Sequence, residues 1–150
     1  MTGMYSATPP PSIDLSIPSE LGYERVAREA VAAFARRMGL DHERVEDLKT
    51  VISEACINAI EHGNAQAPGL RVDVSCVCEG GCLTIEVLDR GLKRYGGHLP
   101  ACIESKLCGD AARRGMGLQI IAQLVDEYGF EAAPCGGNRL RLRLHLRPRG

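Results

Sequence analysis

The segment RLRLRLHLR, residues 139–147, restricts the fold most, because leucine and a basic residue alternate along it without interruption. Successive side chains of a β-strand point to opposite faces, so this period of two predicts a strand with one apolar face and one charged face. The apolar face needs a covering layer, and the charged face fits the solvated side of an open sheet. The alternative for the charged face is a docking surface for an acidic partner. Nucleic acid fits less well, because no aromatic residues interleave with the basic ones.

The spacing of apolar residues predicts further strands and helices. The expected strands are residues 12–17, 70–78 and 83–88, with the last two joined as a hairpin by Glu79-Gly80-Gly81, and a short strand over 130–133. The expected helices are residues 20–38, 42–63 and 117–128. Strands that arrive as hairpins and helices that arrive in blocks indicate an α+β fold. This would be a two-layer sandwich, with a mixed, mostly antiparallel sheet covered on one face by helices.

The first two helices have recognisable ends and core faces. The first is expected to begin at the cap signal Pro18-Ser19-Glu20 and to turn four residues to the core: Val26, Ala30, Phe34 and Met38. Asp41 is expected to cap the second helix. The core face of this second helix is predicted to consist of Val45, Leu48, Ile52, Ala55 and Ala59.

Composition restricts the class of protein. The 150 residues suit a flexible tail over residues 1–11 and a single domain over 12–150, and the net charge of -1 does not favour nucleic-acid or membrane binding. No apolar run reaches the length of a membrane span, and the N-terminus does not resemble a signal peptide, so a cytoplasmic protein is expected. The seven cysteines are then expected to be reduced, with Cys76 and Cys78 as small buried apolar residues rather than metal ligands.

The stretch SEACINAIEHG, residues 53–63, carries Glu54, Asn58 and Glu61 on one helical stripe opposite the apolar face. Taken alone, this stripe predicts a solvated helix face. The strand that ends in Leu88-Asp89-Arg90-Gly91 adds a carboxylate at a strand end, where glycine lets the backbone turn. A short acidic side chain in that place is able to accept a hydrogen bond from the exocyclic amine of a ligand.

A long segment without periodicity, residues 90–114, leads into Arg113-Arg114-Gly115-Met116-Gly117 at a predicted helix start. Glycines at a helix N-terminus let backbone N–H groups approach phosphate oxygens, and the helix dipole favours the negative charge. Long loops of this kind are typically lids or binding loops.

These features occur together in an order that resembles the ATP-binding domains of DNA gyrase, the ninety-kilodalton heat-shock chaperone, histidine kinases and MutL proteins. The resemblance implies their Bergerat-type ATP-binding fold. The chain is similar to the bacterial anti-sigma-factor serine kinases over residues 12–147. Four segments carry this similarity: EACINAIEHG, DRG, RGMGLQIIAQLVDEYGF and the closing G-N-x-L-x-L.

The resemblance implies a role for each motif. Glu54 matches the general base, Asn58 the Mg²⁺ ligand, and Asp89, followed by Gly91, the contact to the adenine amine. Gly115 and Gly117 match the phosphate-binding turn, Arg113 would offset the charge of the γ-phosphate, and residues 90–114 would form a lid over ATP.

Two positions depart from the pattern of this family. Lys93 stands where a second glycine is usual, which would alter the adenine pocket. Asn138 stands where threonine is expected after Gly137, and its amide still donates a hydrogen bond.

The resemblance implies a homodimeric anti-sigma factor. It would sequester a sigma factor and use Mg-ATP to phosphorylate a serine of an anti-anti-sigma protein, without contacting nucleic acid or membrane. The alternative is a partner-switching protein that binds nucleotide and transfers little or no phosphate. A detached catalytic domain of a histidine kinase fits less well, because the short N-terminal tail leaves no room for a His-bearing helix pair. A metal-binding redox protein built on the cysteines fits least.

Overall fold

The computed structural model describes residues 8–65, 67–91, 119–133 and 136–146. Within them lies a five-stranded sheet of order β1-β2-β3-β5-β4, in which every neighbouring pair is antiparallel. The strands are β1 (Ser12–Pro18), β2 (Arg71–Glu79), β3 (Cys82–Leu88), β4 (Glu127–Ala132) and β5 (Asn138–His145). The predicted hairpin and the predicted leucine strand are therefore both present.

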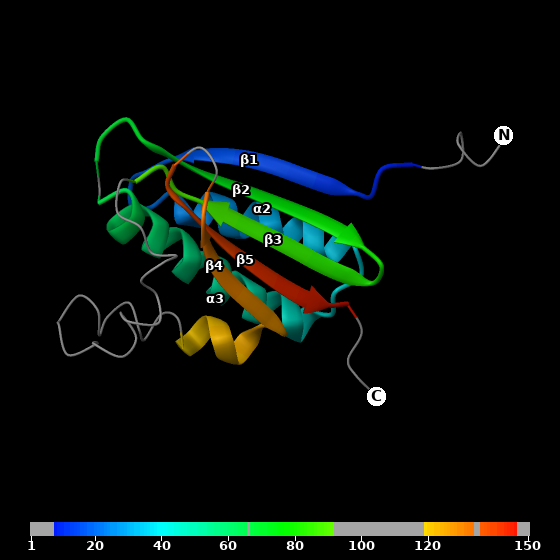
Figure 1. Cartoon of the computed structure of the whole chain (residues 1–150). Coiled ribbons are helices and arrows are strands. Elements are labelled where there is room, and N and C mark those ends of the chain that lie inside the picture. Colours follow the sequence, from blue (N-terminus) through cyan, green and yellow to red (C-terminus); the bar gives the residue numbers. More distant parts are fainter. Residues whose placement is uncertain (1–7, 66, 92–118, 134–135, 147–150) are drawn as a thin grey trace, which may run out of the picture.

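The helices cover one face of this sheet (Figure 1). They are α2 (Glu24–Arg37), α3 (His42–Asn58) and its continuation η1 (Ala59–Gly63), together with a short helix over residues 119–124. Fully buried side chains from both layers, such as Leu48 and Ile52 of α3 and Leu142 and Leu144 of β5, form one core between them. The prediction of a two-layer α+β sandwich is confirmed. Among the described residues, no helix has the length and apolarity that crossing a membrane requires.

The first helix differs from its prediction in its start and in its core face. It begins at Glu24, and Ser19 is instead buried, where its hydroxyl accepts a hydrogen bond from Asn64. Val26 is 53% exposed, while Ala27 and Val31 lie fully in the core. Alanines on several sides of this helix make two neighbouring stripes almost equally apolar, so the spacing of apolar residues did not decide which stripe packs inward.

The second helix matches its prediction up to Asn58. The Oδ1 atom of Asp41 accepts the backbone N–H of Arg44 at 2.8 Å, which caps the helix, and all five predicted core residues are buried. From Ala59 the helix widens into a π-turn, in which the N–H of Asn64 donates to the carbonyl of Ala59 at 2.8 Å. Turns of this kind are rare and occur frequently at functional sites.

The third predicted helix is too long. In the described part of the chain it ends at residue 124, and β4 has begun by Glu127, although the prediction extended to Tyr128. The N–H of Asp126 donates to the carbonyl of Arg143, and Tyr128 pairs with Leu142. Pairing with β5 therefore overrides the local helical pattern, which is a common way for tertiary context to defeat propensity.

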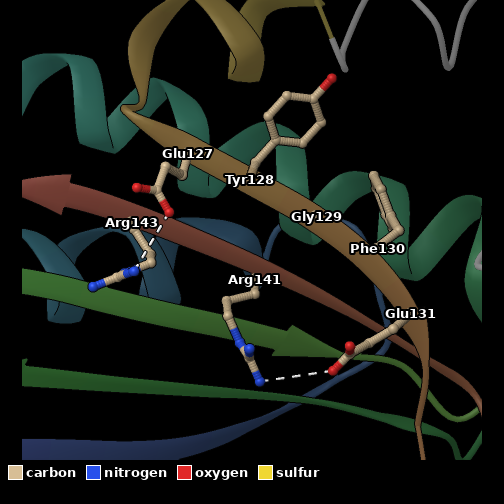
Figure 2. Close-up of a pocket in the computed structure, with 7 residues that line it drawn as sticks. All are labelled: Glu127, Tyr128, Gly129, Phe130, Glu131, Arg141 and Arg143. Atoms are coloured by element: carbon tan, nitrogen blue, oxygen red, sulfur yellow. Dashed lines mark hydrogen bonds and ion pairs between the residues drawn. The ribbon is translucent and has the colours of Figure 1, made fainter.

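The charged face of β5 is matched by glutamates on the two adjacent strands. Arg141 pairs with Glu86 of β3 at 2.9 Å. Figure 2 shows that Arg141 also pairs with Glu131 of β4 and that Arg143 pairs with Glu127, at 3.4 Å for the latter pair. Exposed cross-strand pairs of this kind contribute roughly 0.2–1 kcal/mol each. Because the arginine charge is offset within the sheet, the structure favours a solvated face over a docking surface for an acidic partner.

Asn64 joins three segments just after the π-turn. Its side chain is 2% exposed; Nδ2 donates to the Ser19 hydroxyl at 2.9 Å and to the Arg71 carbonyl at 3.2 Å, and Oδ1 accepts the N–H of Arg90 at 2.7 Å. The end of β1, the start of β2 and the segment after β3 therefore meet at one buried amide.

We expect Asn64→Ala to lower the free energy of unfolding by about 3 kcal/mol, because it leaves buried donors and acceptors without partners. Urea denaturation followed by circular dichroism measures this change. Thr50→Ala is the matched control, because the Thr50 hydroxyl makes only an exposed bond at 3.4 Å to the Glu46 carbonyl. A loss below about 1 kcal/mol in the Asn64 variant would contradict the structural role given to this amide.

Candidate functional site

A pocket lies between α3 and one end of the sheet. Its lining residues come from α3, η1 and three neighbouring strands: Ala55, Asn58, Ala59, Val87, Asp89, Phe130, Asn138 and Leu140. The strand register explains the arrangement, since Leu140 of β5 pairs with Val87 on one side and with Phe130 on the other. Asn58, Asp89 and Asn138, three of the residues predicted from the sequence, are therefore brought to one place.

Asp89 is the buried acid of this pocket, and the residue is 3% exposed. The Asp89 N–H donates to the Asn138 carbonyl, which holds the residue beside β5. Its Oδ1 atom accepts three N–H groups: from Gly91 at 3.0 Å, from the Asn138 backbone at 3.1 Å and from Asn138 Nδ2 at 3.2 Å. Burial raises the pKa of Asp89, while these hydrogen bonds act in the opposite direction.

The predicted donor role of Asn138 fits this geometry. The residue is 2% exposed and directs its amide at the Asp89 carboxylate. Asn138 therefore helps to orient the buried acid from the neighbouring strand.

Three glycines pack their bare backbone around Asp89. A Cβ atom on Gly63 would lie 2.0 Å from Asp89 Oδ2, and one on Gly137 would lie 2.0 Å from the Asp89 carbonyl oxygen. A Cβ atom on Gly91 would lie 1.4 Å from the carbonyl oxygen of Gly63. Sequence reasoning gave Gly63 no role beyond ending a helix, and only the packing shows that η1 must pass this close to Asp89.

We expect Gly91→Ala to lower the free energy of unfolding by about 3 kcal/mol or more, because the methyl group meets backbone that cannot move aside. Gly129→Ala is the control, because a Cβ there meets no atom within 4 Å. It should change stability by less than about 0.5 kcal/mol. Thermal unfolding of the two variants compares them directly, and equal melting temperatures would contradict the tight contact between Gly91 and Gly63.

Glu54 and Asn58 occupy successive turns of α3. Asn58 is 7% exposed and lines the pocket, whereas Glu54 is half-buried and lies outside the pocket lining. Glu61 is also half-buried, beyond the point where the π-turn changes the helical spacing. The polar stripe is thus divided, and Asn58 is the member that reaches the pocket.

The other predicted site residues, Arg113, Gly115 and Gly117, lie outside the described residues, as do Lys93 and all but the first two positions of the expected lid. Phe130, Val87 and Leu140 line the pocket although sequence reasoning assigned them no role. The order of strands in the sheet was the missing information, because it decides which apolar residues flank Asp89.

The sequence predicts that the cysteines are packing residues rather than metal ligands. Burial raises the pKa of Cys76 and of Cys56 to about 12, which keeps both as neutral thiols. Cys76 is fully buried and Cys78 is half-buried. Among the described residues, no group of three or more His, Cys, Asp or Glu side chains is placed to hold a metal ion.

Comparison with known proteins relates this site to a family. A profile described as "Histidine kinase-like ATPase domain" matches residues 17–144. An anti-sigma F factor from Thermoanaerobacter pseudethanolicus is 29% identical over 136 residues, which cover 89% of this chain and 93% of that protein. A Bacillus pumilus protein named serine-protein kinase RsbW is 31% identical over 126 residues, covering 80% of this chain and 78% of that protein.

The fold also has a counterpart among solved structures. A crystal structure of the RsbU and RsbW domains of a Mycobacterium tuberculosis protein aligns with a TM-score of 0.66 at 24% identity, covering 92% of this chain and 33% of that one. This likeness supports the α+β architecture, which is the ATP-binding fold that the sequence motifs implied. With the profile spanning most of the chain, we conclude that the protein belongs to the histidine kinase-like ATPase domain family.

Proposed function

We propose that the protein is an anti-sigma factor and protein serine kinase. It would sequester a sigma factor and use Mg-ATP to phosphorylate a serine of an anti-anti-sigma protein. The observation that carries this proposal is the buried Asp89 carboxylate beside Asn58, one helical turn from Glu54, in a chain similar over most of its length to proteins named anti-sigma F factor and serine-protein kinase RsbW. The protein would act in the cytoplasm, as a homodimer.

The residues that line the pocket have the chemistry to bind a purine nucleotide. Val87, Leu140, Ala55 and Ala59 supply apolar walls for a flat base, and the Asp89 carboxylate is an acceptor for its exocyclic amine. The amide oxygen of Asn58 is a suitable ligand for Mg²⁺, a hard ion that completes its shell with phosphates and waters. By the family pattern, Gly115, Gly117 and Arg113 would contact the phosphates.

We infer that Glu54 acts as the base in phosphate transfer. When the serine hydroxyl of the partner forms its bond to the γ-phosphorus of ATP, the bond from that phosphorus to the β-phosphate oxygen would break and ADP would leave. The hydroxyl proton would pass to the Glu54 carboxylate. Bound Mg-ATP would supply the phosphoryl group, and its Mg²⁺ would offset the negative charge on the phosphate oxygens. Glu54 lies on the same helix as Asn58, so α3 would hold the proton acceptor and the metal ligand at a fixed separation.

Incubation of the protein with Mg-ATP and its cognate anti-anti-sigma protein tests the proposal. Mass spectrometry should find one phosphoserine on that partner, and the phosphorylated partner should no longer displace the sigma factor. ATP binding and nucleotide-dependent partner exchange without phosphoserine would favour the partner-switching protein that transfers no phosphate. A protein that binds neither ATP nor a sigma factor would refute both functions.

A further inference from the structure

The pocket beside Asp89 is small. Its volume is about 10 Å³, which is room for about one water molecule. A purine base is many times larger, so a side chain in the wall must move before a base enters. The exposure of the lining residues points to one wall.

All but one of the lining residues belong to the buried class, with exposed fractions of 2–7%. Val87 and Leu140 pack in the core, and alanines have no side-chain torsion to rotate. Asp89 and Asn138 are held by the hydrogen bonds between β3 and β5. Phe130 is the exception, because it is half-buried and at the rim of the core.

The position of Phe130 suits movement and contact with a base. It lies on β4, which is an edge strand of the described sheet, and pairs with Leu140. Figure 2 shows its ring on the side of β4 that faces α3, opposite to the side chain of Glu131. Across the pocket from β4, α3 presents Ala55 and η1 begins with Ala59. A rotated ring would therefore leave a flat slot between an aromatic face and two small side chains.

We propose that Phe130 is the base-stacking residue of this pocket: its ring rotates to admit the purine and then covers one face of the base. The inference rests on the proposed function, because it assumes that a nucleotide binds beside Asp89. Stacking on an aromatic side chain depends on the flat face of a base and not on which base it is. Phe130 would thus recognise a purine through its ring, while Asp89 recognises its amine.

The test compares Phe130→Leu with Tyr128→Leu. Leucine keeps an apolar side chain at both positions. Tyr128 lies on the same strand as Phe130 but does not line the pocket beside Asp89. By isothermal titration calorimetry, Phe130→Leu should weaken Mg-ATP binding by about 5- to 150-fold. Binding of inorganic tripolyphosphate, which has no base, should stay unchanged, and Tyr128→Leu should bind Mg-ATP like the wild type.

Proton NMR of bound ADP supplies a readout that a structural role would not affect. The adenine H2 and H8 signals should move upfield in the wild type by the ring current of Phe130, and this shift should be lost in Phe130→Leu. Equal or tighter ATP binding by a folded Phe130→Leu variant would overturn the inference and leave the proposed function intact. No ATP binding by the wild type would overturn both.

Discussion

Replacing Asp89 with asparagine should abolish ATP binding while the protein remains folded. The amide oxygen of asparagine is able to accept the N–H groups of Gly91 and Asn138 that now bind Oδ1. Its NH₂ group then replaces the acceptor oxygen that the adenine amine requires, so two donors meet in a buried pocket. Sites built to hydrogen-bond a ligand reject the wrong partner by factors of about 10⁴. We expect at least a hundredfold weaker binding of Mg-ATP by calorimetry.

The same variant should be at least as stable as the wild type at neutral pH. Burial raises the pKa of Asp89, so its ionised form is disfavoured in the folded protein. The stability linked to this group is present below its unfolded pKa and is lost as the pH rises through its folded pKa. Asparagine has no ionisable side chain, so the variant does not lose stability in this way as the pH rises.

The stability advantage of Asp89→Asn should therefore be largest at neutral pH and should shrink below about pH 4. Asp73 and Asp126, whose pKa values are lowered because hydrogen bonds and arginine charge outweigh the effect of burial, are present in both proteins and cancel in the comparison. Urea denaturation at pH 7 and pH 3.5 measures the difference. A variant less stable than the wild type at pH 7 would show that the three hydrogen bonds outweigh the burial of the charge.

Replacing Glu54 with glutamine should reduce formation of phosphoserine by about 10²- to 10⁴-fold, the usual contribution of a general base. ATP affinity should change less than twofold, because Glu54 lies outside the lining of the pocket. Single-turnover phosphorylation of the anti-anti-sigma protein, with calorimetry of ATP binding, separates the two effects.

Glu61→Gln is the matched control for Glu54→Gln. Both glutamates are half-buried and belong to the same polar stripe of the sequence, but Glu61 lies in the π-turn beyond Asn58. It should transfer phosphate at the rate of the wild type. If both variants transfer phosphate equally well, the proton has another acceptor and Glu54 is not the base.

The fold was predictable wherever the signal was local. The alternation in β5 and the turn at Gly80 specified their elements without help from the rest of the chain, and the Asp41 cap has the predicted bond to Arg44. The prediction failed where distant contacts decide. Residues whose spacing predicts the end of a helix belong to β4, because they pair with the backbone of β5. In the first helix, Ala27 packs in the core and Val26, which was predicted there, is exposed.

The site divides in the same way. Asp89 and Asn58 were recognisable from the order of the motifs along the chain and from the family resemblance that this order carries. Phe130 and Gly63 are ordinary residues in their local sequence, and their importance comes from which strand or turn lies beside Asp89. Motif reasoning therefore found the polar groups of the pocket and missed the surfaces that shape it.

The order of the strands along the sequence determines the order in which they are able to join the sheet during synthesis. The wall contributed by α3 and β3 is made early, whereas β4 and β5, which carry Phe130 and Asn138, are the last strands of the described chain. Since chains fold from the N-terminus as they are made, the pocket is complete only when the C-terminal strands have docked. A ligand that needs all these walls binds only the finished protein, and by mass action it then stabilises the attachment of the last strands.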